Sequence, residues 1–495
     1  MRITRPSVIG LIFGLSAAKP ALANPELIQG TWVEITPAEV TTGAPETCIG
    51  QGIQIDPHSP STLYWGNTPY QEPDGGLFKS TNGGETWNKV AATAPRWQGA
   101  NDYVSMPVHV RVDPNDGQHL YAVDGVRGSA TGFFISTDGG ENFVRPPGFQ
   151  SALSAASITT DDCYDVAVDP ADFDHVLVSF HSAWNWESAM YGYDAGIMES
   201  TDGGESWTAH PPAGPWGAGH AVKFLYSPEL GLGDSNTWLV GTQGDGFWRT
   251  TNAGDDWNHV SETDITHGGG TTYYASSGVL YAAGLSTMKS TDNGATWSNA
   301  GPGSTWAVYG DGDTLYTGGS FGANQSFQVS PETDGASWGD YNAQKFPDGP
   351  YEMAYDTTNG ILYSSNWTSG VWALKVGEGT GVIPDPPTGG SSSGGAGAGG
   401  STSTGGSGTS SGGSATTSGG SGGSGTGGAG TASGGAGTFT GGSTVANPSG
   451  DDRPPESDPG CACRAGRGQA PGSAWALLLG AFFVVRRWLF RDPKP

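Results

Sequence analysis

The chain has 495 residues and a formal net charge of −27, because 48 Asp and Glu residues outnumber 21 Lys and Arg residues. This acidity argues against nucleic acid as a partner and against adhesion of the folded part to anionic lipid, since both carry negative charge. Among the 9 His and 4 Cys residues, no pair has the spacing of metal ligands, so we expect no metal and no cofactor.

The first 23 residues have the layout of a secretory signal peptide. Two arginines precede an apolar stretch at residues 8–18, and the small-residue sequence ALA ends at Ala23. This order is typical of a signal that is cleaved, here before Asn24. We therefore predict a signal peptide at residues 1–23 and a mature chain that is secreted.

Five copies of one eight-residue motif follow along the chain. They read STNGGETW, STDGGENF, STDGGESW, TTNAGDDW and STDNGATW, and a degenerate sixth copy ends at Trp338. The aromatic ends recur at steps of about 40 to 64 residues, a period typical of the blades of a β-propeller. The five aromatic ends are Trp87, Phe143, Trp207, Trp257 and Trp297, and the third positions are Asn82, Asp138, Asp202, Asn252 and Asp292.

Each motif has the residue types of a tight turn. Its Asp or Asn can accept hydrogen bonds from nearby backbone N–H groups, and the glycine at the fifth position can adopt a positive φ. The aromatic side chain that follows can bury about 150 Å² or more between neighbouring sheets. We therefore assign the motif a structural role and not a catalytic one.

A second recurring phrase, a short β-rich run that ends at Asp-Pro, precedes the first three motifs. Asp56, Asp113 and Asp169 stand at this point, and another β-rich run follows each after a turn. This recurring order of β-rich runs and turn motifs predicts seven units of up to four strands each. The last unit has no motif and no fourth strand, whereas residues 31–35 form a strand without a unit. Because a closed ring hides its last sheet edge, we predict that this N-terminal strand completes the seventh blade.

The motifs resemble the Asp-box, or BNR, repeats of sialidases, sortilin-type receptors and xyloglucanases, and the resemblance covers residues 30–376. It implies an all-β, seven-bladed β-propeller with Asp-box turns, which we place at residues 24–380. It leaves the activity open, because propellers of this kind include glycosidases, receptors and assembly factors.

The C-terminal part has a different composition. Residues 381–459 are dominated by Gly, Ser, Thr and Ala, which cannot bury a core, so we predict a disordered linker. Within residues 460–495, Cys461 and Cys463 precede a short apolar run and an arginine cluster. This order resembles the C-terminal sorting tails of myxobacterial surface proteins, which implies that the cysteines mark the processing and anchoring point. The alternative is an ordinary anchor with one short transmembrane helix. In both cases only the tail contacts the membrane.

Cys48 and Cys163 are the two cysteines of the predicted propeller, and each precedes the first strand of a unit. Both should therefore emerge on one face near the central channel, where an oxidising compartment would allow a disulfide between them. Two buried thiols are the alternative, because the first and third blades are not neighbours.

Two sets of loops share one face of the predicted propeller: those that lead into each first strand and those that join each second strand to the third. We expect the ligand to bind at this face. The third unit carries a long insertion there, FHSAWNWESAMYGYDAG. Aromatic rings stack on sugar C–H faces and carboxylates accept hydroxyl hydrogen bonds, so this composition favours a polysaccharide ligand. The alternative is that the tryptophans pack the loops together. The predicted ligand-binding residues of this face are Trp184, Trp186, Tyr191, Tyr193, Arg127 and His220.

Alternation along the first strands predicts which side chains line the central channel. Counting back from the Asp that ends each strand gives His109, Asp165 and Glu352 at four residues, and Gln54 and Arg111 at two. The predicted channel is polar and mixes acids with Arg and His. It either contributes to ligand binding, through His109 and Arg111, or holds ordered water.

Hydrolysis of a neutral glycan needs two carboxylates at a fixed separation. A sialidase needs three arginines from several blades, whereas three of the five propeller arginines come from the second unit, so we do not expect that activity. The sequence therefore predicts a secreted, surface-tethered, monomeric propeller that binds an extracellular ligand, with a polysaccharide preferred. Glycoside hydrolysis and a sortilin-like scaffold for a surface protein are the alternatives. The candidate catalytic acids are Asp124, Asp161, Asp162, Asp165, Glu187 and Asp194.

Overall fold

The structure is a computed structural model of the 495-residue chain. It describes residues 27–69, 75–90, 109–124, 131–185, 192–266, 269–320 and 322–381. The predicted signal peptide, the predicted linker beyond its first residue, and the C-terminal segment with Cys461 and Cys463 lie outside these ranges. None of the helices within them has the length and apolar character needed to cross a membrane.

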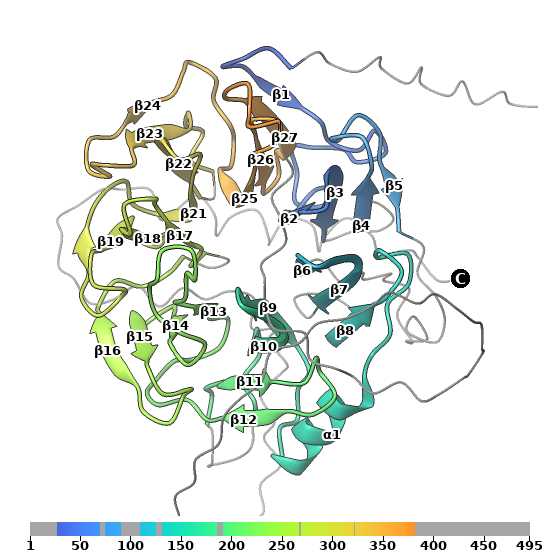
Figure 1. Ribbon diagram of the computed structural model, residues 1–495, viewed down its shortest axis with the longest axis vertical. Coiled ribbons are helices and arrows are strands. Elements are labelled where there is room, and N and C mark those ends of the chain that lie inside the picture. The colour runs from blue at the N-terminus through green and yellow to red at the C-terminus, as the bar shows by residue number, and fades with distance from the viewer. Residues whose placement is uncertain are drawn as a thin grey trace, which may run out of the picture. The chain divides into compact units, whose positions relative to one another are not determined.

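Seven antiparallel sheets form the blades of a β-propeller, which confirms the predicted fold (Figure 1). The first strand of each blade lies nearest the axis, and the chain moves outward strand by strand. Blade 1 consists of β2 (Gly50–Asp56), β3 (Ser59–Asn67), β4 (Gly76–Ser80) and β5 (Asn88–Lys89). Blade 2 consists of β6 (His109–Asp113), β7 (Asp116–Asp124) and β8 (Gly132–Ser136). Blade 3 consists of β9 (Cys163–Asp169), β10 (Asp172–Phe180), β11 (Ile197–Ser200) and β12 (Thr208–His210). Blade 4 consists of β13 (Ala221–Phe224), β14 (Trp238–Gly241), β15 (Phe247–Thr250) and β16 (Asn258–Ser261). Blade 5 consists of β17 (Thr272–Tyr274), β18 (Leu280–Ala282), β19 (Met288–Ser290) and β20 (Ser298–Asn299). Blade 6 consists of β21 (Thr305–Gly310), β22 (Thr314–Gly319), β23 (Gln328–Pro331) and β24 (Gly339–Asp340). Blade 7 consists of β25 (Pro350–Asp356), β26 (Ile361–Asn366), β27 (Gly370–Lys375) and β1 (Trp32–Glu34).

The seventh blade joins the two ends of the propeller, as the sequence predicted. Its strand order is β1–β27–β26–β25, and β1 pairs antiparallel with β27, with Trp32 opposite Leu374. The Trp32 side chain is buried, and its ring centre lies 4.4 Å from that of Phe327, directly before β23 of blade 6. The N-terminal strand therefore completes the last sheet and also packs against the preceding blade.

The five repeated motifs form turns that follow the third strand of a blade. In blade 3, the Asp202 carboxylate accepts hydrogen bonds from the Ser206 backbone N–H at 2.8 Å and from the Ser200 hydroxyl at 2.9 Å. Gly204 has a φ of 91°, and a Cβ there would lie 2.8 Å from the Phe133 ring of blade 2, which explains the glycine. The corresponding hydrogen bonds occur at Asn82, Asp138, Asn252 and Asp292.

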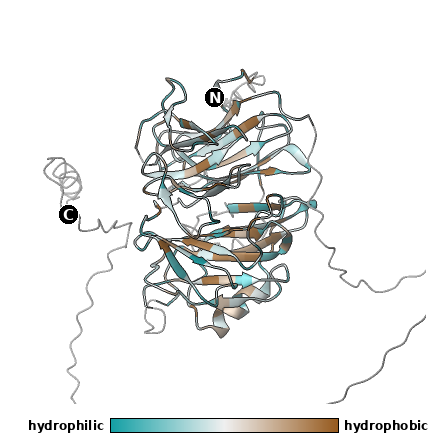
Figure 2. Ribbon diagram, turned by 60° about the vertical axis from the view of Figure 1, so that its left-hand side comes forward, coloured by the Kyte–Doolittle hydropathy of each residue, from teal (hydrophilic) through white to brown (hydrophobic). Residues whose placement is uncertain are grey.

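Hydrophobic side chains fill the spaces between blades. In Figure 2 the hydrophobic stretches run along the strands, while many turns and loops are hydrophilic. Between blades 2 and 3, Tyr121 stacks on Phe173 with ring centres 4.6 Å apart. Trp207, which ends the motif of blade 3, lies edge-on to Phe133 at 4.9 Å. The motif aromatic therefore packs against the neighbouring blade, as the sequence analysis expected.

Blade 2 departs from the four-strand pattern. After its motif, Val144 forms only a single bridge with Ile135, and the chain then enters α1 (Pro147–Ala155). Phe149 and Leu153 of this helix pack into the core shared by blades 2 and 3. This helix follows the motif at the point where the other blades have a fourth strand, and it was not predicted from the sequence.

The predicted disulfide between Cys48 and Cys163 is wrong, because both residues are buried thiols. Cys48 lies in the core between blades 7 and 1 and donates a hydrogen bond to the Trp367 carbonyl at 3.5 Å. Cys163 begins β9 and lies in the core between blades 2 and 3. The two thiols fill different cores and do not meet, which was the stated alternative. Burial raises the pKa of the Cys48 thiol to about 12, so it stays protonated at physiological pH.

Candidate functional site

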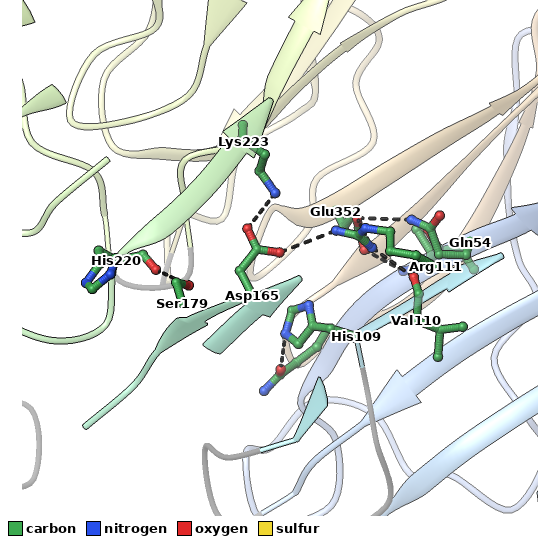
Figure 3. A network of polar contacts seen from close by, with 11 residues as sticks. Gln54, His109, Val110, Arg111, Asp165, Ser179, His220, Lys223 and Glu352 are labelled. Carbon is green, nitrogen blue, oxygen red and sulfur yellow. Dashed lines mark hydrogen bonds and ion pairs between the residues drawn. The ribbon is translucent and has the colours of Figure 1, made fainter. Parts of the chain in front are cut away.

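The first strands of five blades direct polar side chains toward the propeller axis. Arg111 comes from β6, Asp165 from β9, Lys223 from β13 and Glu352 from β25, and Gln54 of β2 lies beside them (Figure 3). Side chains between these positions, such as Val110 and Val166, are buried in the cores between blades. The strand alternation used in the sequence analysis therefore located four of these five side chains.

Arg111 bridges the two carboxylates of this network. Its guanidinium nitrogens lie 3.4 Å from Asp165 Oδ1 and 3.3 Å from Glu352 Oε1. Lys223 donates a hydrogen bond to Asp165 Oδ2 at 2.6 Å. Glu352 also accepts hydrogen bonds from the Gln54 side chain at 3.1 Å and from a backbone N–H of β2 at 3.0 Å. Two cations thus face two carboxylates, and every carboxylate oxygen has a donor.

The environment of the network moves the pKa values of its two carboxyl groups apart. Burial by itself raises the pKa of Asp165, but Lys223 and Arg111 outweigh this effect and hold the pKa below its usual value. Burial also raises the pKa of Glu352, and there the same two cations offset only part of the effect. Carboxyl groups with diverging pKa values are used in acid–base catalysis, and they also occur in structural ion-pair networks.

The channel is narrow on the side where the first strands begin. Ile49, Trp306, Tyr351 and Trp367 form a buried cluster there, with the two tryptophan rings 5.3 Å apart. His109 lies next to this cluster, and burial lowers its pKa to about 4, so its ring is neutral. A cavity of only about 20 Å³ is left beside the ion pairs on this side. Of the predicted channel residues, His109 therefore lies at the narrow end.

On the other side of the ion pairs the channel widens into a cavity of about 450 Å³. We call it the axial vestibule and define it by Gln54, Arg111, Lys223, Tyr309 and Glu352, which all line it. The turns that join first to second strands form its rim. Its volume falls within the range of about 300 to 1,000 Å³ that is common for small-molecule sites. The vestibule opens on the face opposite to the loops that the sequence analysis favoured.

The rim of the axial vestibule is set by turns that leave β2, β9 and β25. Pro57, Pro170, Thr357 and Thr358 lie in these turns and line the cavity. The turns are held by carboxylates that end the strands: Asp56, for example, accepts a hydrogen bond from the His58 backbone N–H at 2.8 Å. The Asp-Pro phrase of the sequence therefore shapes the mouth of the cavity. Its carboxylate stabilises the turn and does not line the cavity.

Two residues of the predicted ligand face, Trp184 and His220, are buried in the structure. Trp184 is 0 % exposed and lies edge-on to Phe180 at 5.6 Å, so it packs the loop. His220 is also 0 % exposed, donates a hydrogen bond to the Gly196 carbonyl at 3.2 Å, and has its pKa lowered to about 4 by burial. The prediction that these two side chains meet a ligand is wrong in this structure, because neither has surface to offer. Tyr193 is 66 % exposed and stays a candidate. The predicted residues whose side chains lie outside the described part are Asp124, Arg127, Trp186, Glu187 and Tyr191.

Three candidate catalytic acids of the loops are held by structural partners. Asp161 forms an ion pair with Arg145 at 3.4 Å. Asp162 lies 3.1 Å from the His181 ring. Asp194 accepts a hydrogen bond from a backbone N–H of the neighbouring loop. These contacts tie loop segments together, which gives each acid a structural role.

Lys223 is the member of the network that the sequence analysis missed. The unit that contains β13 reads AVKFLYSPEL and lacks the Asp-Pro phrase from which positions were counted. A signal was nevertheless present, since a lysine between apolar residues of a first strand is directed away from the cores between blades.

A second buried ionic cluster lies in blade 3. The His175 ring contacts Asp169 at 3.1 Å and Glu199 at 2.9 Å, and Glu199 also contacts His210 at 2.8 Å. Burial by itself lowers the pKa of His175, but its hydrogen bonds to the two carboxylates outweigh this and raise the pKa to about 9. Across the ranges that the structure describes, no three or more His, Cys, Asp or Glu side chains are grouped to hold a metal ion.

The sequence and the fold were compared with those of known proteins. No family model matches the chain. The sequence is similar to a xyloglucanase of Paenibacillus sp., with 25% identity over 279 residues that cover 50% of this chain and 26% of that protein. It is also similar to the xyloglucanase Xgh74A of Acetivibrio thermocellus, with 27% identity over 288 residues that cover 50% of this chain and 32% of that protein. These relatives are xyloglucanases. The matched part is about a third or less of their length.

The fold is also similar to that of a solved xyloglucanase. The GH74 xyloglucanase of Xanthomonas campestris matches with a TM-score of 0.46 and 18% sequence identity, over 70% of this chain and 54% of that one. At this level of identity the similarity concerns the propeller fold alone.

Proposed function

We propose that this protein is a secreted, surface-attached β-propeller that binds an extracellular polysaccharide. The observation that carries the proposal is the sequence similarity to xyloglucanases over half of the chain. The charge balance of the axial network supports a ligand without net charge, because its two cations already face two carboxylates. We therefore infer that xyloglucan or a related neutral polysaccharide is the ligand class.

Binding without hydrolysis is the function that the geometry supports best. A glycosidase needs two carboxyl groups that reach the glycosidic bond from either side. Asp161, Asp162 and Asp194 are engaged in loop contacts, and Asp165 is held by Lys223 and Arg111. Breaking the buried ion pairs of Asp165 to free it as a catalytic group costs several kcal/mol, on the order of 3 to 5.

Hydrolysis is the second candidate, because the relatives are named for it. Asp165 and Glu352 are the carboxyl groups that it would use, since their pKa values are shifted in opposite directions and both contact Arg111. Glu352, with its raised pKa, would be the acid, and Asp165 would be the ionised partner.

The proposed location rests on the sequence of the two ends of the chain. A signal peptide at residues 1–23 would export the propeller at residues 24–380, and the linker at residues 381–459 would separate it from the surface. The segment at residues 460–495, processed near Cys461 or Cys463, would attach it. This arrangement places a polysaccharide-binding domain outside the cell, where such a ligand occurs.

The test is a binding and hydrolysis assay on one sample of the intact chain. The chain is incubated with a panel of polysaccharides that includes xyloglucan, and both its retention and the release of reducing ends are recorded. Retention without release supports binding, and release that disappears in the variant Glu352→Gln supports hydrolysis. If no polysaccharide retains the chain and pull-downs recover a surface protein, the scaffold alternative replaces the proposal.

A further inference from the structure

The axial vestibule is wide at its mouth and narrows at the ion pairs. Its mouth lies among the turns that follow the first strands, and its floor is the ion-pair network of Arg111, Asp165, Lys223 and Glu352. Behind this floor the channel narrows to a space of about 20 Å³, which lies beside the buried cluster around Trp306. A space of about 20 Å³ is too small for a pyranose ring. A polymer therefore does not pass beyond the ion pairs, and only an end of a chain can enter.

The volume of the axial vestibule limits how much of a chain end it can hold. Its volume of about 450 Å³ is about three times the roughly 150 Å³ of a protein cavity that admits a single six-membered carbon ring. One or two pyranose rings therefore fit. Small side chains at Ala167, Ala307 and Ala354 help to leave this space in the lining.

The lining of the axial vestibule offers both donors and acceptors. Lys223 uses one of its three donor positions on Asp165, and Gln54 and Glu352 add amide and carboxylate groups. The first strands are also sheet edges, so part of their backbone N–H and C=O groups face the channel. Tyr309 and Tyr355 supply aromatic surface. Mixed donors and acceptors beside aromatic rings suit a ring with several hydroxyl groups and apolar C–H faces.

We propose that the axial vestibule binds the terminal one or two sugar residues of a neutral polysaccharide, so that the protein recognises chain ends and not chain interiors. The proposal rests on the proposed polysaccharide binding and names the site and the part of the polymer involved. The floor of two cations and two carboxylates discriminates against an acidic terminal sugar, because no cation is left without a counter-charge.

The first variant closes the mouth without touching the floor. Thr357 is exposed and lines the rim of the axial vestibule, so the variant Thr357→Trp puts a large ring across the opening. Thr208 is also exposed, on the outer strand β12 of blade 3, and Thr208→Trp serves as the matched control. Circular dichroism and thermal unfolding check that both variants keep the fold. A second variant, Lys223→Met, removes a donor from the floor while keeping the length of the side chain.

The measurement is the affinity of the intact chain for xyloglucan oligosaccharides. We expect Thr357→Trp to weaken binding by at least about tenfold, and Thr208→Trp to leave it within about twofold. We also expect Lys223→Met to weaken binding, since the ligand loses a hydrogen-bond donor. With long and short xyloglucan chains at equal mass, the amount of protein bound should rise with the number of chain ends.

The outcomes separate this inference from the proposed function. If the intact chain binds xyloglucan and Thr357→Trp binds equally well, the polysaccharide function stands and the axial site is wrong. Binding that follows polymer mass and not the number of ends overturns the end recognition. Tighter binding of oligosaccharides that end in a uronic acid overturns the neutral ligand class. If the intact chain binds no polysaccharide at all, the proposed function and this inference both fail.

Discussion

The N-terminal strand offers the sharpest quantitative prediction on the fold. Trp32 of β1 is 3 % exposed, and its ring lies 4.4 Å from Phe327 of the neighbouring blade 6 and 6.1 Å from Phe346 of the loop that follows this blade. The variant Trp32→Ala therefore empties a space between blades 6 and 7 and weakens the closure of the ring. Truncation of a buried Trp costs about 3 to 5 kcal/mol in the free energy of unfolding.

This cost converts into a shift of the thermal midpoint. A domain of roughly 350 residues has an unfolding entropy near 0.7 kcal/mol/K, so a loss of about 3 to 5 kcal/mol lowers Tm by about 4 to 7 °C. Differential scanning calorimetry of the intact chain measures the shift. The matched control is Glu34→Ala in the same strand, because Glu34 is exposed and its loss should change stability by less than about 0.5 kcal/mol.

The result that would refute the reasoning is a Trp32→Ala variant whose Tm equals that of the Glu34→Ala control. Such an outcome would mean that β1 does not hold the ring closed in solution, despite its pairing with β27. A separate low-temperature transition would instead point to unfolding of blade 7 alone, and it would contradict the prediction that the propeller unfolds as one unit.

Three further predictions concern the turns, the blade 3 cluster and the cysteines. Asp202→Ala removes an acceptor of three hydrogen bonds and should cost about 1 to 2 kcal/mol, measured by denaturant unfolding, and an unchanged midpoint would contradict the assigned turn role. Because hydrogen bonds raise the pKa of His175 to about 9, its stabilisation is fully present below about pH 6.5 and is lost as the pH rises toward 9. The variant His175→Gln should therefore flatten the alkaline limb of a Tm against pH profile, and an unaltered limb would exclude the charged imidazolium. Since Cys48 and Cys163 are separate thiols, a reducing agent should leave Tm unchanged, and a drop in Tm would restore the disulfide.

The sequence predicted the elements whose causes are local. The turn motifs, the strand alternation and the unpaired N-terminal strand each have a signature within one unit, and together they predicted seven blades and their closure. Gln54, Arg111, Asp165 and Glu352 were placed at the axis by counting along single strands, and the structure finds them there. Local patterns were sufficient because each blade is built from neighbouring residues.

Features that depend on packing between blades could not be predicted in this way. Trp184 and His220 were predicted to bind a ligand, with loop packing as the alternative for the tryptophan, and their burial is decided by Phe180 and by the loop around Gly196. Cys48 lies just before β2 and Cys163 begins β9, yet each thiol is buried in a separate core. The narrow end of the channel likewise arises from side chains of several blades, which no single repeat reveals.

The central claim is that the propeller binds a polysaccharide. Isothermal titration of the intact chain with xyloglucan, followed by an assay of reducing ends on the same sample, tests it most directly. The account predicts saturable heat of binding and no rise in reducing ends. The absence of heat with xyloglucan and with other neutral polysaccharides would contradict it.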